Sequence, residues 1–205
     1  MIRYTTVAKE ADAEQTIDRS RFIAHIAPVY SKEEADAFIA AIRAKYKDAT
    51  HNVPAFIVGE KSELKWTSDD GEPQGTSGPP MLQMLEREGL TNLVCVVTRY
   101  FGGIKLGTGG LVRAYTSSAK LALEAAGKHT VRDVSKMVVE IPYTLLGKLQ
   151  NLEKNEPFMI EDAIYTDAVT LHLSMNLEDE NRVGALLMEV SAGNAKILET
   201  SQICC

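Results

Sequence analysis

The sequence predicts an α+β protein with two domains. Its 205 residues are enough for two domains that each bury a core. Strand-like and helix-like segments are mixed up to residue 133. After it they follow the order β-α-β-β-α-β, which is typical of a ferredoxin-like sandwich with an antiparallel sheet. We therefore expect domains at residues 1–133 and 134–205.

The first part of the N-terminal domain predicts two strands and a helix. Residues 13–18 and 21–30 show the alternation of apolar and polar or smaller side chains that is typical of strands. Ser31 and Glu34 have the spacing of a capping box, which predicts the start of the helix in SKEEADAFIAAIRAKYK. Its apolar residues share one face, so we expect this helix to cover a sheet.

A hairpin, a second helix and a buried strand are expected next. Residues 55–60 and 63–68 are short β-prone runs with two residues between them, which favours a hairpin. Pro79 and Pro80 suit the first turn of a helix that Gly89 ends. The run NLVCVVTRY is almost entirely apolar, as expected for a central strand that is buried on both faces.

The stretch RYFGGIKLGTGGLVRAY, residues 99–115, leads into a predicted helix over residues 109–126. A glycine-rich turn before a helix offers backbone N–H groups and a positive helix end, which favour an anion. The sequence patterns of the P-loop and of the Rossmann fold are absent. Alternatively, the glycines only supply positive φ for a tight turn. The candidate anion-binding residues are Arg99, Lys105, Gly107, Thr108, Gly109, Gly110 and Arg113.

The charge distribution along the chain leaves room for a local basic patch. The formal net charge of −6 argues against a protein that wraps nucleic acid by bulk electrostatics. The segment from Thr91 to Lys120 nevertheless contains lysines and arginines and no acidic residue. This segment includes the whole glycine-rich stretch.

Five other residues could line a site. Asp69, Asp70 and Glu72 place three carboxylates within SDDGEPQGTSG, a composition that suits Mg²⁺ or Ca²⁺, but the calcium-loop pattern is incomplete. Turn formation is the alternative for these carboxylates. His51 could act as a general base, and a hydrogen-bonding role is its alternative. Tyr100, like the neighbouring Phe101, could stack on an exposed base, and core packing is the alternative for both. We expect no bound metal and no cofactor.

Cysteine content and hydropathy argue against disulfide-rich, zinc-binding, membrane and secreted proteins. The three cysteines fit neither a disulfide framework nor a zinc motif, and we expect the Cys204–Cys205 pair to be an ordinary chain end. No apolar run reaches the ~20 residues that cross a bilayer. The first residues lack the apolar core of a secretory signal. We therefore expect a cytoplasmic protein with no membrane partner.

The strings SRFIAH, ATH, DDGEPQGTSGPP and VVTRYFGGIKLGTGGLVRAY resemble the IMPACT family, in its bacterial YigZ-like branch. The resemblance covers residues 1–127, and the remainder is similar to the C-terminal domain of bacterial members. It implies an N-terminal ribosomal-protein-like βαβ sandwich, of a type shared with a translation factor and with small-molecule kinases, before a ferredoxin-like domain. It also implies a role in translation or nucleic-acid binding, without an accepted enzymatic activity.

Three functions are compatible with these observations. The first is a non-enzymatic binding protein of translation regulation that contacts RNA, the ribosome or a translation factor through the glycine-rich loop. The second is a Mg²⁺-dependent enzyme that acts on a phosphorylated small molecule or nucleotide, for which the carboxylates must lie within ~10 Å of Lys105 and the glycines. The third is a protein-interaction module with an exposed apolar patch.

Overall fold

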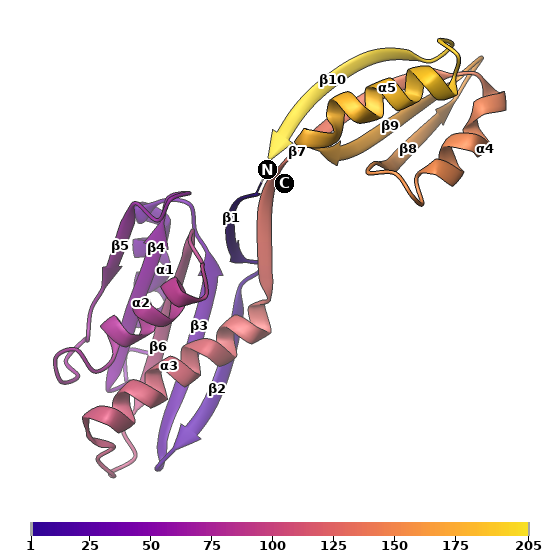
Figure 1. The fold of residues 1–205 in the computed structure, drawn as a ribbon. Coiled ribbons are helices and arrows are strands. Elements are labelled where there is room, and N and C mark those ends of the chain that lie inside the picture. The colour runs from indigo at the N-terminus through magenta and orange to yellow at the C-terminus, as the bar shows by residue number, and fades with distance from the viewer. Residues whose placement is uncertain (1, 205) are drawn as a thin grey trace. The chain divides into compact units, whose positions relative to one another are not determined.

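The computed structural model describes residues 2–204, and the chain divides into two compact units (Figure 1). Residues 4–130 form one unit, and residues 131–204 form the other together with residues 2–3. Each unit combines one sheet with its own helices, so the expected α+β class with two domains is confirmed. Among the described residues, no helix combines the length and the hydropathy that crossing a membrane requires.

The N-terminal unit is built on a five-stranded sheet in which neighbouring strands are antiparallel. The strand order is β2 (Ala11–Ile17), β3 (Ser20–Pro28), β6 (Leu93–Tyr100), β4 (His51–Val58) and β5 (Leu64–Thr67). The central strand β6 is buried along all but its last residue. This agrees with the prediction for NLVCVVTRY, and β4 and β5 form the predicted hairpin.

Helices cover both faces of this sheet. The helix α1 (Lys32–Lys45) packs on one face, and the Ser31 hydroxyl accepts a hydrogen bond from the backbone N–H of Glu34, as predicted. The helices α2 (Gly78–Arg87) and α3 (Gly107–Ala126) pack on the opposite face. Because successive side chains of a strand point to opposite faces, alternate residues of β6 contribute to two separate clusters of buried side chains.

The C-terminal unit has the ferredoxin-like order. Its strands lie in the order β10 (Lys196–Cys204), β7 (Lys128–Ile141), β9 (Val169–Asn176) and β8 (Met159–Tyr165), all antiparallel. The helices α4 (Tyr143–Leu152) and α5 (Glu180–Val190), the latter preceded by the short helix η1 (Leu177–Asp179), pack on one face. Cys204 ends β10, and Cys205 lies outside the described residues.

Two differences from the sequence predictions concern strands. The strand β1 (Ile2–Val7) was not expected, and β7 begins at Lys128, before the predicted strand at KMVVEIPYT. In the sheet β1 lies beside β7. These two strands are far apart in the sequence, so local patterns of apolar and polar residues do not predict that they pair. The helix α3 also begins slightly early, at Gly107 instead of Gly109.

Candidate anion-binding site

The loop of residues 101–106 joins the end of β6 to the start of α3, and its turn accounts for three of the glycines. A Cβ at Gly102 would overlap the backbone carbonyl of Arg19, so only glycine fits at this close approach. Gly103 and Gly107 have φ of +85° and +70°, which other residues rarely adopt. The turn alternative therefore explains Gly102, Gly103 and Gly107. It does not explain Gly109, which is helical and whose Cβ would make only an ordinary contact.

A cavity of about 390 Å³ opens beside this loop. Its lining comes from the 69–77 segment, the end of β6, the loop and the first turns of α3. The lining residues are Glu72, Pro73, Arg99, Phe101, Lys105, Leu106, Gly107, Thr108 and Leu111. The structure thus places four of the seven candidate residues around one cavity, together with Glu72.

The floor of the cavity is a buried ion pair. Arg99 donates to Glu72 Oε1 from Nη1 over 2.5 Å, and the side chains are 5% and 4% exposed. The Tyr115 hydroxyl donates to the same oxygen over 2.7 Å. Burial first, and then the charge of Glu72, raise the pKa of Tyr115 far above its usual value, so this hydroxyl stays protonated. His51 Nε2 lies 3.8 Å from Glu72 Oε1.

Aromatic rings hold the Arg99 guanidinium in place. Its central carbon lies 5.4 Å from the ring centroid of Phe22 and 5.4 Å from that of Phe101, within the range of cation–π contacts. Arg99 Nη2 also donates to the Ser20 hydroxyl. Because Glu72 neutralises its charge, Arg99 contributes directed N–H donors to the cavity floor more than net positive charge.

The positive charge around the loop comes from Lys105 and Arg113. Both side chains are exposed, and neither has an ion-pair partner within residues 2–204. Arg113 Nη1 lies 3.6 Å from the position of a Cβ on Gly109, so this guanidinium folds back over the first turn of α3. No side-chain hydrogen bond caps the start of α3. Its first backbone N–H groups therefore keep their donors available for a ligand.

The three carboxylates of SDDGEPQGTSG do not act together. Asp69 accepts hydrogen bonds from the backbone N–H groups of Gly75, Ser77 and Gly78, and thereby caps the start of α2. Although burial acts in the opposite direction, these bonds and that of the Ser77 hydroxyl lower the pKa of Asp69. Turn and cap formation thus describes Asp69, and of the three only Glu72 reaches the cavity.

Asp70 also forms hydrogen bonds within the fold. Its carboxylate accepts from Arg43 Nη2 over 2.8 Å and from the backbone N–H of Asn52 over 2.6 Å, and its carbonyl oxygen accepts from His51 Nδ1. Across the described part of the chain, no group of three or more His, Cys, Asp or Glu side chains is arranged to hold a metal ion.

Tyr100 lies away from the cavity. Its side chain follows the alternation of β6 to the opposite face of the sheet, where the hydroxyl donates to Asp48 over 3.0 Å and Arg21 lies over the ring. The neighbouring Phe101 lines the cavity instead and is 47% exposed.

The sequence analysis did not predict that Tyr115 donates a hydrogen bond to Glu72. A tyrosine on an otherwise alanine-rich buried stripe of α3 was a usable signal, because a buried hydroxyl needs a polar partner.

Comparison with known proteins identifies both parts of the chain. The Impact N-terminal domain matches residues 18–123, and the Domain of unknown function (DUF1949) matches residues 139–194. The IMPACT family member YvyE of Bacillus subtilis is 37% identical over 196 residues, covering 96% of this chain and 90% of that protein. The IMPACT family member YigZ of Escherichia coli is 33% identical over 186 residues, covering 90% of this chain and 91% of that protein.

A solved structure shares the fold over nearly the whole chain. The protein described as "Crystal structure of an hypothetical protein" superimposes with a TM-score of 0.62 at 32% identity, covering 97% of each chain. All candidate site residues fall within the span of the Impact N-terminal domain. Two domain matches in chain order and relatives that align over most of its length show that this chain belongs to the IMPACT family.

Proposed function

We propose that this protein is a non-enzymatic binding protein with a role in translation regulation, and that it contacts RNA phosphate, free or in the ribosome, at the glycine-rich loop. Family membership supports the link to translation. The observation that carries the RNA contact is the pair of exposed, unpaired cations, Lys105 and Arg113, beside the uncapped start of α3. In this account Lys105 and Arg113 meet phosphate as charge-assisted donors, while backbone N–H groups at residues 107–110 complete the site.

Further cations favour a polyanion over a single phosphate. Arg87 and Lys120 line a cavity between α2 and α3 together with Glu88, and Lys120 shares another cavity with Arg113. Within the described residues none of these three side chains forms an ion pair, whereas the nearby acid Glu88 is paired with Lys128. Arg87 on α2 and Arg113 and Lys120 on α3 form a group of cations without ion-pair partners on two neighbouring helices, and a nucleic-acid backbone binds to such a group.

The enzymatic alternative has less support from the geometry. A shared metal and phosphate site would need carboxylates free to coordinate a cation. Asp69 and Asp70 are engaged by backbone N–H groups and by Arg43, and Glu72 is engaged by Arg99 and Tyr115. A translation factor with an acidic surface is the remaining alternative partner, and the test below separates it from RNA.

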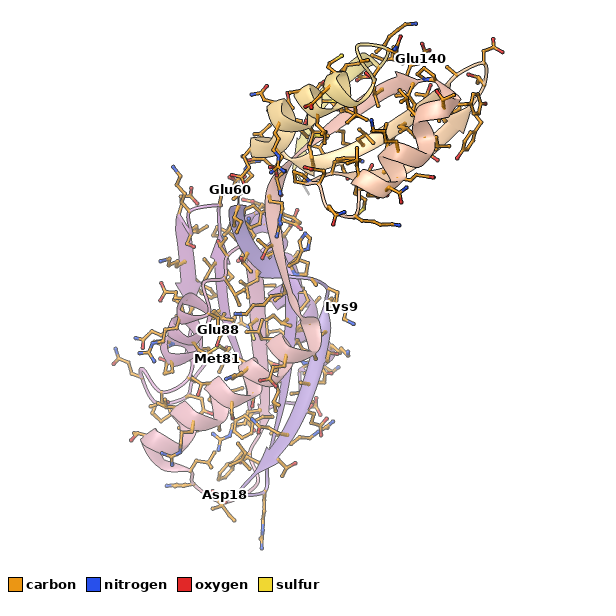
Figure 2. The ribbon with its side chains drawn as sticks, turned by 45° about the vertical axis from the view of Figure 1, so that its right-hand side comes forward. Lys9, Asp18, Glu60, Met81, Glu88 and Glu140 are labelled. Carbon is orange, nitrogen blue, oxygen red and sulfur yellow. The ribbon has the colours of Figure 1, made fainter. Side chains whose placement is uncertain are left out.

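The test is RNA binding measured as a function of salt concentration for the wild type and for Lys105→Ala combined with Arg113→Ala. Each phosphate contact that is lost should reduce the slope of log K against log salt by about 0.7 to 0.9. A charge-matched control is Lys9→Ala combined with Lys47→Ala. Both control lysines are exposed, and Lys9, labelled in Figure 2, lies between β1 and β2.

The control should keep the wild-type slope and affinity. If the Lys105 and Arg113 variant also keeps them, this loop is not the RNA contact. If RNA binds none of the proteins while an acidic translation factor binds the wild type and not this variant, the partner is a protein and the RNA proposal is wrong.

A further inference from the structure

We infer that the cavity beside the glycine-rich loop takes one unstacked nucleobase of a single-stranded RNA, whose phosphate lies at the start of α3. The inference rests on the proposed function and adds the class of nucleic acid and the part of the nucleotide that enters the protein. It is drawn from three features of the cavity: its walls, its floor and its rim.

The walls suit a flat aromatic group. Pro73, Phe101, Leu106 and Leu111 make most of the lining apolar, and the volume of about 390 Å³ lies within the ~300–1,000 Å³ of small-molecule sites. Phe101 lines this cavity and is 47% exposed. An exposed aromatic ring beside a positively charged loop is the platform on which single-stranded nucleic acids stack their bases.

The floor carries polar groups that a base edge can satisfy. The Nε of Arg99 is buried without a hydrogen-bond partner among the described residues, which is unusual for a buried donor. Both hydrogen bonds that the Glu72 side chain accepts converge on Oε1. The other carboxylate oxygen, Oε2, accepts no hydrogen bond from the described residues, and an amino or imino group on the edge of a nucleobase can donate to it.

The rim places an anion site next to the apolar walls. Lys105, Gly107 and Thr108 line the same cavity as Phe101, so a group that fills it lies beside the start of α3. A free phosphate would make no contact with the apolar walls, and an apolar side chain would make no ionic contact with Lys105. A nucleotide makes both contacts, because its base is apolar on its faces and its phosphate is charged. In a duplex the bases stay stacked inside the helix and cannot enter such a cavity.

The test compares three labelled RNAs of about ten nucleotides by fluorescence anisotropy: a single strand, the same backbone without bases, and the duplex. We expect the wild type to bind the base-bearing strand roughly 5- to 150-fold more tightly than the abasic strand. Phe101→Ala should bring this ratio close to one, whereas Phe101→Tyr should keep it. Ile104→Ala is the matched control, because Ile104 is 41% exposed in the same loop and does not line the cavity.

The outcomes separate this inference from the proposed function. Phe101→Ala removes no charge, so its salt slope should equal that of the wild type. Equal wild-type affinity for the base-bearing and abasic strands, with the salt slope intact, would overturn the base pocket and leave the phosphate contact standing. The pocket would also be overturned if the wild type bound the duplex more tightly than the single strand. The same holds if Ile104→Ala, like Phe101→Ala, lost the preference for the base-bearing over the abasic strand. Failure to bind any RNA would overturn both.

Discussion

Arg99 is the residue on which the geometry of the cavity depends. It is paired with Glu72, flanked by Phe22 and Phe101, and hydrogen-bonded to Ser20, so its guanidinium has one fixed position. Removing Glu72 would leave a buried cation without a counter-charge, which typically costs about 3–5 kcal/mol. The ion pair is therefore a rigid floor, and the exposed Lys105 and Arg113 are the cations that a ligand can reach without such a cost.

His25 is a buried histidine that contacts Asp12 and Tyr46 and lies outside the candidate site. Its side chain is 1% exposed, Nδ1 lies 2.7 Å from Asp12 Oδ1, and Nε2 is buried without a partner among the described residues. Burial lowers the pKa of His25 and outweighs the opposite effect of Asp12. The folded protein therefore resists protonation of this imidazole more than the unfolded chain does.

We predict that the free energy of unfolding falls as the pH is lowered through the ordinary histidine pKa of ~6.5. The unfolded chain binds the proton first, so the stabilisation is complete above this pKa and is lost below it. For one proton the slope is at most about 1.4 kcal/mol per pH unit. Urea unfolding at a series of pH values from about 7.5 to about 5 measures how the free energy of unfolding changes with pH. His25→Gln should flatten the profile, and the exposed His129→Gln should not. Equal profiles for both variants would contradict this role.

At the scale of elements, the loop between β6 and α3 combines two kinds of glycine. Gly102 is required by a close approach to the backbone of Arg19, whereas Gly109 lies in the first turns of α3 with room for a side chain. The first kind fixes the path of the loop. The second lowers the helical propensity of α3 where it begins.

We predict opposite effects for two alanine substitutions in this loop and helix. Gly102→Ala should destabilise the N-terminal unit by roughly 1–3 kcal/mol, because its Cβ would displace backbone. Gly109→Ala should be neutral or stabilise it by up to about 1 kcal/mol, since alanine is the better helix former. Thermal and urea unfolding of the two variants would measure this contrast. A Gly102→Ala variant as stable as the wild type would refute the close approach.

Most elements could be predicted because their signals are local. Ser31 caps α1 as expected, the prolines open α2, and Gly89 follows its end with a φ of +71°. The pairing of β1 with β7 could not be predicted, because it joins segments that are distant in the sequence. Local patterns therefore identify elements well and sheet partners poorly.

The candidate site was predictable only in part, for a similar reason. The glycine-rich stretch is continuous in sequence, so its residues were expected to lie together. Which carboxylate of SDDGEP meets them depends on a turn in which Asp70 and Gly71 have φ of +47° and +87°. This turn sends Asp69 toward the start of α2 and Glu72 toward the cavity. Such backbone angles are not evident from residue types alone.

At the scale of the whole molecule, the local charge near the glycine-rich loop is more important for the proposed RNA binding than the total charge of the chain. The chain has a formal net charge of −6, yet the segment from Thr91 to Lys120 contains no acid and supplies Arg99, Lys105, Arg113 and Lys120. Every residue of the candidate site belongs to the unit formed by residues 4–130. RNA binding by this small basic region should weaken as salt is added, and the few cations that meet phosphate should set the slope of log K against log salt, at about 0.7 for each contact with a single strand.

The central claim is that the backbone N–H groups at the start of α3 hold an RNA phosphate. The most direct measurement is a titration of the isotope-labelled protein with single-stranded RNA, followed through the amide chemical shifts. We predict that the amides of Gly107, Thr108, Gly109 and Gly110 shift first and in proportion to bound RNA, while those of α4 and α5 stay unchanged. Bound RNA that leaves the amides of residues 107–110 unshifted, or that shifts only the C-terminal unit, would contradict the claim.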